Sequence, residues 1–152
     1  MPQDQYPSSV LEVLDDNMSF KPAALRAVRA FAKSKPWRGD IDERKDKLRG
    51  LNEALAAAYE MPKPDVVFGQ SDGGSSGGSY YHPTRHQIVL NGRLSVVTYL
   101  HEFAHSRGRG ERDACRWSVN IFKRCFPRSF ARLVHQGHML VRPEEIERRK
   151  VS

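Results

Sequence analysis

Two histidines and a glutamate fall within little more than one helical turn in the run His101-Glu102-Phe103-Ala104-His105. Residues four apart on a helix share a face, so His101 and His105 can present their imidazoles to one metal ion. Glu102 lies beside this pair, where a carboxylate can act as general base toward a water molecule held by the metal. The spacing therefore indicates a hydrolytic metal centre with Zn2+ as the expected cofactor.

A catalytic zinc needs about three protein ligands and one open position, so the chain must supply a third ligand. Gly108 and Gly110 permit the backbone to reverse after His105, and Glu111 then begins the next expected helix, where the helix dipole favours a carboxylate. We therefore expect Glu111 to be the third ligand. Three alternatives stay open, namely Asp113, His135 and His138.

An amphipathic helix must carry the motif. Apolar residues at three-, three- and four-residue spacing form one buried face, and they are Leu94, Val97, Leu100 and Ala104. The turn signal Asn91-Gly92 precedes this helix. The motif is thus expected at a defined place on a packed element.

The preceding part of the chain is first helical and then strand-like. Three helices are expected, over residues 7–16, from 19 or 20 to 34, and over 41–59, the last with Asp40 as N-cap. Three short strands are expected, over residues 65–69, 79–82 and 86–90. Helices, then a small sheet, then helices make an α+β fold.

The chain of 152 residues fits one domain. We expect a helical N-terminal layer over residues 1–60, a catalytic core over 61–141 and a charged tail over 142–152. No apolar run approaches the roughly 18 residues of a membrane span, and the N-terminus lacks a secretory signal pattern. Cys115 and Cys125 would lie about 15 Å apart along a helix, too far for a disulfide. These features favour a cytoplasmic protein without a membrane partner.

The net charge of +7 is unevenly distributed. Residues 107–132 contain eight Lys or Arg residues and two acidic residues, so this segment alone carries +6. Such a segment can attract nucleic acid or an acidic protein, although no recognised nucleic-acid motif accompanies it. Binding of nucleic acid through residues 107–132 is therefore a second expectation.

The motif and the helix after it resemble the ImmA/IrrE metallopeptidases, in which HExxH is followed by a helix patterned E-x-x-A-x-x-F-A. Here Glu111 and Ala114 stand at the first two positions, and Trp117-Ser118 replaces the Phe-Ala pair. The resemblance covers residues 80–121. It implies a minimal zincin-like fold in which three side chains bind zinc and a fourth acts as base. The implied ligands are His101, His105 and Glu111, and the implied base is Glu102.

The same resemblance implies how a substrate would bind. An extended protein or peptide substrate would pair its main chain with an edge strand beside the active-site helix. The strand expected over residues 86–90 is the candidate for that edge.

Two other families are similar over the motif. The metzincin pattern HExxHxxGxxH has Gly108 in place and Glu111 where the third histidine would stand. The SprT-like proteases, which act near DNA, fit the basic charge and would make His135 or His138 the third ligand. All three families agree on the HExxH residues.

The sequence thus predicts a zinc-dependent metallohydrolase, an endopeptidase in which Glu102 is the general base. One alternative is a basic module that binds nucleic acid or protein and whose zinc site is structural or vestigial. A metallohydrolase acting on a non-peptide bond is the other.

Overall fold

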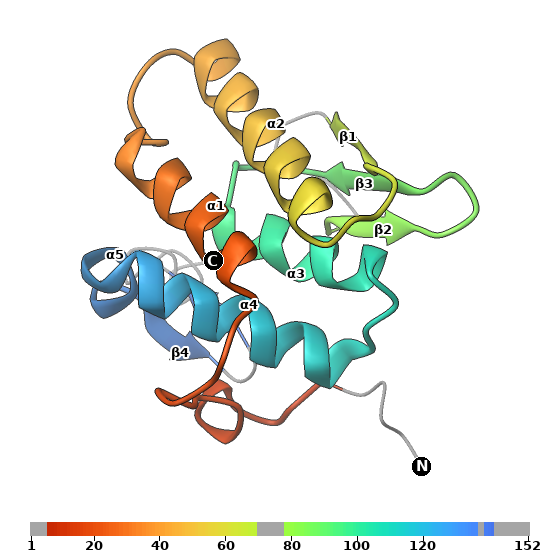
Figure 1. Ribbon diagram of the computed structural model, residues 1–152. Helices are drawn as coiled ribbons and strands as arrows, with labels where there is room; N and C mark the ends of the chain where they lie inside the picture. Colours follow the sequence, from red (N-terminus) through yellow and green to blue (C-terminus); the bar gives the residue numbers. More distant parts are fainter. Residues whose placement is uncertain (1–5, 70–77, 137–138, 142–152) are drawn as a thin grey trace, which may run out of the picture.

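The computed structural model describes residues 6–69, 78–136 and 139–141 (Figure 1). Its helical elements are the 3-10 turn η1 (Val10–Glu12) and the helices α1 (Pro22–Lys33), α2 (Ile41–Ala58), α3 (Val96–Ser106), α4 (Glu111–Cys125) and α5 (Pro127–Ala131). Its strands are β1 (Asp65–Phe68), β2 (Tyr80–His82), β3 (Gln87–Leu90), β4 (Val134–Gln136) and β5 (Met139–Val141). This is the predicted α+β arrangement. The predicted charged tail, 142–152, lies outside the described residues.

Local sequence explains where the main helices begin. Pro22 opens α1 at a position where its missing N–H leaves no hydrogen bond unmade. Asp40 caps α2 by accepting a hydrogen bond from the backbone N–H of Glu43, as predicted. Ser95 caps α3 in the same way through the N–H of Thr98. The helices predicted around residues 19–34 and 41–59 are therefore confirmed as α1 and α2.

The prediction of a helix over residues 7–16 is wrong. Only the turn η1 forms there, and a capping box between Ser9 and Glu12 closes it. Val10 and Val13 are buried, with exposed fractions of 0% and 3%. These two valines anchor an irregular segment, residues 6–18, which we call the N-terminal strap.

The sheet order corrects a second prediction. β3 lies in the centre, with β1 parallel on one side and β2 antiparallel on the other. The strand predicted over residues 86–90 is therefore not an edge strand, because both of its sides are already paired. β2 is the edge strand that contacts α3.

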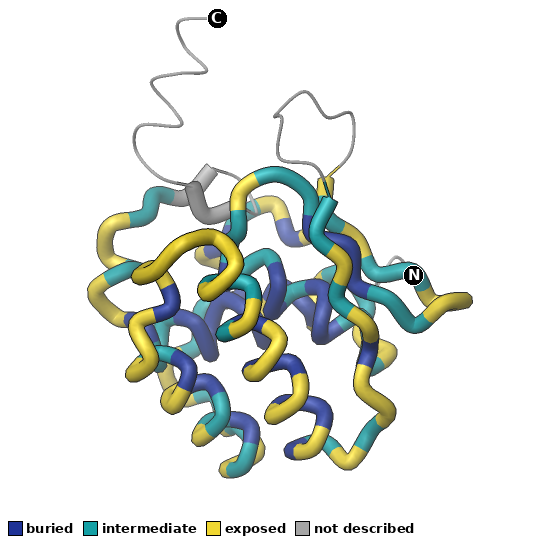
Figure 2. Tube along the Cα trace, turned by 90° about the horizontal axis from the view of Figure 1, so that it is seen from above, coloured by how far each residue is buried: buried dark blue, intermediate teal, exposed yellow. Residues whose placement is uncertain are grey.

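Helix α3 lies between the sheet and α4. It packs on β2 and β3 on one side and on α4 on the other, while α1 packs against both α2 and α4 (Figure 1). Figure 2 shows the buried positions gathered on the inward sides of these elements. The largest fully buried side chains include Tyr99, Leu100 and Phe103 of α3, Ile88 of β3 and Ile121 of α4. Burial on both sides fixes the helix that carries the motif.

A buried polar network also holds α3 in place. The Tyr99 hydroxyl donates a hydrogen bond to Oδ1 of Asn52 on α2, at 2.8 Å. The amide nitrogen of Asn52 donates in turn to the carbonyl of Pro64, just before β1, also at 2.8 Å. Asn52 is only 3% exposed. The network therefore ties α3 and α2 to the start of the sheet.

Tyr99→Phe is expected to lower the free energy of unfolding by about 1–2 kcal/mol, because it leaves the buried Oδ1 of Asn52 without its donor. The measurement is a urea titration followed by circular dichroism. Tyr80→Phe, at a residue that is 47% exposed, is the matched control. Equal midpoints for the two variants would contradict the role given to this network.

Candidate metal centre

Three side chains from two helices meet at one point. They are His101 and His105 on α3 and Glu111, the first residue of α4, and their ligand atoms all lie within 4.8 Å of one another. The two histidine Nε2 atoms are 3.1 Å apart, and His101 Nε2 is 3.4 Å from Glu111 Oε2. Two atoms bound at about 2.0–2.1 Å to one tetrahedral ion would be about 3.3 Å apart. The group can therefore hold a metal ion.

The connection of residues 107–110 places Glu111 opposite the two histidines. Gly108 has a φ of 83°, a conformation that glycine adopts at little cost, and it reverses the chain after α3. Gly110 has an ordinary φ of −78° and precedes the first residue of α4. The guanidinium of Arg107 lies 3.7 Å from the ring centroid of Tyr59. The reversal predicted from the glycines is thus confirmed. Gly108 is the position at which the positive φ favours glycine.

The surroundings of the three side chains suit a cation. His105 Nδ1 is 2.8 Å from the carbonyl oxygen of Arg109, so this nitrogen donates and Nε2 stays available for a metal. His101 Nδ1 lies 3.7 Å from the Cys115 sulfur on its other side. Glu111 Oε2 is buried, and the described residues supply no hydrogen-bond partner for it. Such an orphaned oxygen is costly unless a ligand satisfies it.

Glu102 lies beside the centre and is only 7% exposed. Its burial, and secondly the negative charge of Glu111, raise the pKa of the Glu102 carboxyl from 4.5 to about 8. The nearby backbone N–H of Tyr81 on β2 opposes this rise. The Glu102 carboxyl group thus lies near both the edge strand and the candidate ligand Glu111.

The alternative third ligands differ in where they lie. Asp113 is exposed on α4 and does not belong to the group of converging side chains. His135 belongs to β4, where its backbone pairs with Leu140, and its side chain lies outside the described structure. His138 also lies outside the described residues. Among the candidates whose side chains are described, Glu111 is the one that meets the two histidines.

Two residues at the centre were not foreseen from the sequence. The Tyr6 ring stacks on His101 with centroids 6.0 Å apart, and its hydroxyl lies near the Glu111 carboxylate. Burial, followed by the nearby Glu111 carboxylate, raises the pKa of the Tyr6 hydroxyl. Burial likewise raises the pKa of the Cys115 thiol to about 12, so the thiol is neutral. Of these two residues, only Cys115 could have been placed near the centre from the sequence, because it follows Glu111 by one helical turn.

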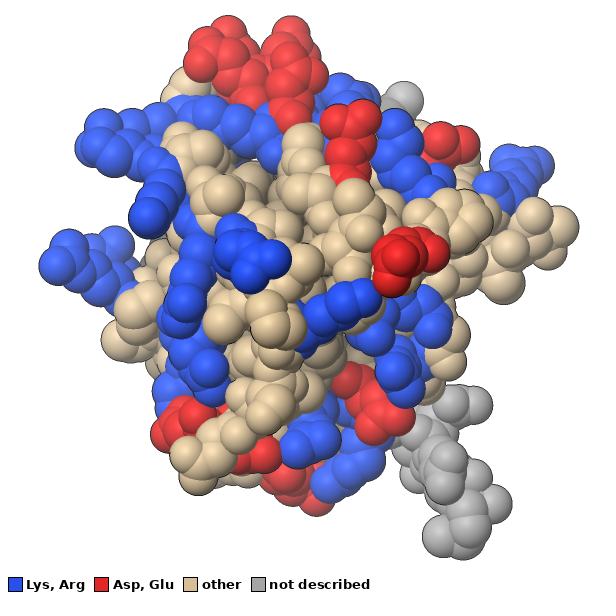
Figure 3. Space-filling model, viewed as in Figure 1, with Lys and Arg blue, Asp and Glu red and all other residues tan. Residues whose placement is uncertain are grey.

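Some basic side chains of the segment 107–132 make contacts within the chain. Four of its eight basic residues contact groups elsewhere in the chain. Arg107 stacks on Tyr59, Arg116 pairs with Asp15, Lys123 pairs with Asp16, and Arg124 donates to the carbonyls of Asp16 and Met18. Figure 3 shows Lys and Arg side chains spread over one face with acidic side chains among them. Nucleic-acid binding through this segment stays a prediction.

No family model, curated protein or solved structure matches this chain. Among the described helices, none is long and apolar enough to cross a membrane. The arrangement of side chains at the centre therefore carries the functional argument.

Glu102→Gln is expected to stabilise the metal-free protein by about 1–2 kcal/mol at pH 8, with a smaller gain at pH 5. As the pH rises above 4.5 the unfolded chain loses the Glu102 proton, but the folded protein keeps it until about pH 8, so the wild-type protein loses stability in this window. Glutamine has the same shape and does not ionise. Urea titrations in the presence of a chelator measure the difference, and an equal gain at both pH values would contradict it.

Proposed function

We propose that this protein is a zinc-dependent metallohydrolase that cleaves peptide bonds. The observation that carries the proposal is the convergence of two imidazoles and one carboxylate, with a second, buried carboxylate beside them. Nitrogen and oxygen donors in a His2Glu set are those of catalytic zinc sites with one open position. Zinc is therefore the ion that we assign to His101, His105 and Glu111.

Glu102 is the general base of the proposed reaction. When bound, a zinc ion supplies a Lewis acid for the scissile carbonyl and lowers the pKa of a water molecule toward about 7. Glu102 accepts the proton of the attacking water and then delivers it to the leaving amine. Glu102 is buried, and its carboxyl group lies near both Glu111 and the backbone N–H of Tyr81. A bound cation also offsets the negative charge of Glu111 and so favours the ionised, basic form of Glu102.

The edge strand β2 supports a peptide as the substrate. β2 is an edge strand of the three-stranded sheet and pairs with β3, and the backbone N–H of Tyr81 on β2 lies near Glu102. An extended peptide can pair with such an edge through its main chain, which would bring a peptide bond to the catalytic groups. The Tyr81 hydroxyl lies 2.7 Å from Nδ1 of His86, and His86 Nε2 lies 2.8 Å from the Pro62 carbonyl. These two contacts of His86 hold the β2–β3 hairpin in place, and β2 is its edge strand.

Glu111→Gln is expected to weaken zinc binding by at least about 100-fold, because an amide is a far poorer zinc ligand than a carboxylate. Asp113→Asn is the matched control, since Asp113 is an exposed carboxylate on the same helix two residues away. Competition with a chromophoric chelator measures both affinities. Equal zinc affinities for the two variants would rule out Glu111 as a ligand.

Glu102→Gln is expected to keep stoichiometric zinc and to lose about 100- to 10,000-fold in proteolytic rate, because the base is removed while the ligands remain. The assay is cleavage of a fluorescently labelled unstructured protein by the zinc-loaded enzyme, with zinc content measured on the same samples. A Glu102→Gln variant as active as the wild-type protein, or a wild-type protein without zinc affinity, would contradict the proposed function.

A further inference from the structure

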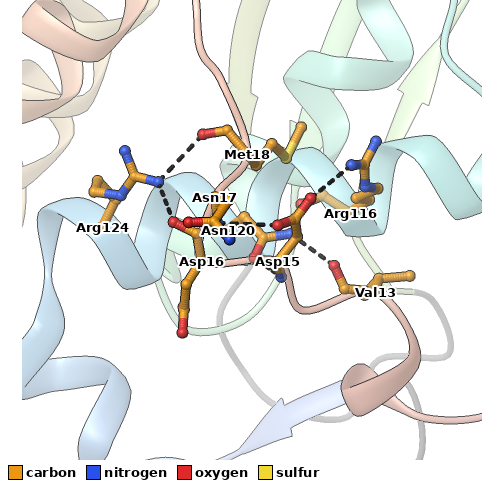
Figure 4. Close-up of polar contacts among 8 residues, drawn as sticks. All are labelled: Val13, Asp15, Asp16, Asn17, Met18, Arg116, Asn120 and Arg124. Atoms are coloured by element: carbon orange, nitrogen blue, oxygen red, sulfur yellow. Dashed lines mark hydrogen bonds and ion pairs between the residues drawn. The ribbon is translucent and has the colours of Figure 1, made fainter.

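The N-terminal strap is clasped to α4 around one buried side chain (Figure 4). The amide nitrogen of Asn120 donates to the carbonyl of Val13 at 2.8 Å, and its Oδ1 accepts from the backbone N–H of Asp15 at 2.8 Å. Asn120 is 3% exposed, so these bonds are shielded from water. Because a buried amide left unpaired is costly, Asn120 fixes the backbone of the strap at this point.

Charged side chains on α4 hold the strap on both sides of Asn120. Arg116 pairs with Asp15 at 2.9 Å, one turn toward the metal centre. Arg124 donates to the carbonyls of Asp16 and Met18, at 2.9 and 3.2 Å, one turn in the other direction (Figure 4). The strap therefore follows α4, whose first residue is the candidate ligand Glu111.

The clasp brings the strap to the metal centre through Tyr6. This residue is 51% exposed, so it is not a core residue. Its ring nevertheless lies nearly parallel to that of His101, at an interplanar angle of 16°, and its hydroxyl lies near the Glu111 carboxylate, which raises the pKa of that hydroxyl. One side chain from the strap thus contacts two of the three candidate ligands, one from each helix.

We infer that Tyr6 is a positioning residue of the metal centre, whose hydroxyl orients the Glu111 carboxylate and whose ring covers His101. This role rests on the proposed function, since it requires that these two side chains bind the metal. Hydrogen-bond partners that orient metal ligands typically contribute 10- to 100-fold to metal affinity. The phenol supplies such a donor to Glu111, and the stacked ring restricts the rotation of the His101 imidazole.

The decisive variant is Tyr6→Phe, which keeps the ring and removes the donor. Its zinc affinity, measured by competition with a chromophoric chelator, is expected to fall about 10-fold. Tyr6→Leu removes the stacked ring as well and is expected to bind zinc at least as weakly as Tyr6→Phe. Leu11→Ala, at a strap residue that is 64% exposed, is the matched control and is expected to bind zinc as the wild-type protein does.

Asn120→Ala tests whether the strap delivers Tyr6 to the centre. This variant keeps the ligands and Tyr6 but releases the clasp, so its zinc affinity is expected to fall as well. The double variant with Tyr6→Phe is expected to bind zinc no more weakly than Asn120→Ala alone, because both changes act through the same contact. Additive losses would overturn the link through the strap, and circular dichroism shows whether each variant is folded.

The outcomes separate this inference from the proposed function. Wild-type zinc affinity in Tyr6→Phe would overturn the role of Tyr6, and the proposed function would stand if Glu102→Gln still abolished proteolysis. A 10-fold weaker affinity in Tyr6→Phe supports the role of Tyr6, even if the wild-type protein cleaved no peptide bond. A wild-type protein that bound no zinc would overturn both.

Discussion

The four-residue connection between α3 and α4 is the constraint on which the metal centre depends. Its length determines which residue begins α4. If α4 began one residue earlier or later, the side chain at its start would point in a direction about 100° away. The connection is held by packing, because Arg107 stacks on Tyr59 and lies 5.9 Å from the ring of Trp117, which is only 6% exposed. The position of the third candidate ligand thus follows from an aromatic contact and the reversal at Gly108.

The centre also departs from the rules of an ordinary core. Two carboxyl groups and two imidazoles come together where the pKa of Glu102 is raised and one oxygen of Glu111 has no hydrogen-bond partner among the described residues. Without a cation these groups oppose folding, since buried carboxylates repel each other and lack solvation. A bound ion offsets the like charges and satisfies the orphaned oxygen. Local conflict of this kind is typical of residues retained for function.

The parts of the centre that were predictable are local in the chain. The spacing of His101 and His105, the glycine after the helix and the carboxylate at the next helix start are all read within about ten residues. Strand pairing is not local, and so β3 was wrongly expected at an edge, although it pairs with β1 and β2 on both sides. Tyr6 also escaped prediction, because no periodicity or spacing links it to His101 across 95 residues.

The clasp between the N-terminal strap and α4 has a consequence for biosynthesis. Its hydrogen bonds join residues 101 to 108 positions apart in the chain. Tyr6 leaves the ribosome long before α4 is made, and contacts of such high sequence separation form only after the intervening chain is present. The nascent chain therefore carries the N-terminal strap without its partner helix until α4 has been made. The surroundings of the metal centre are thus completed only once α4 has been synthesised.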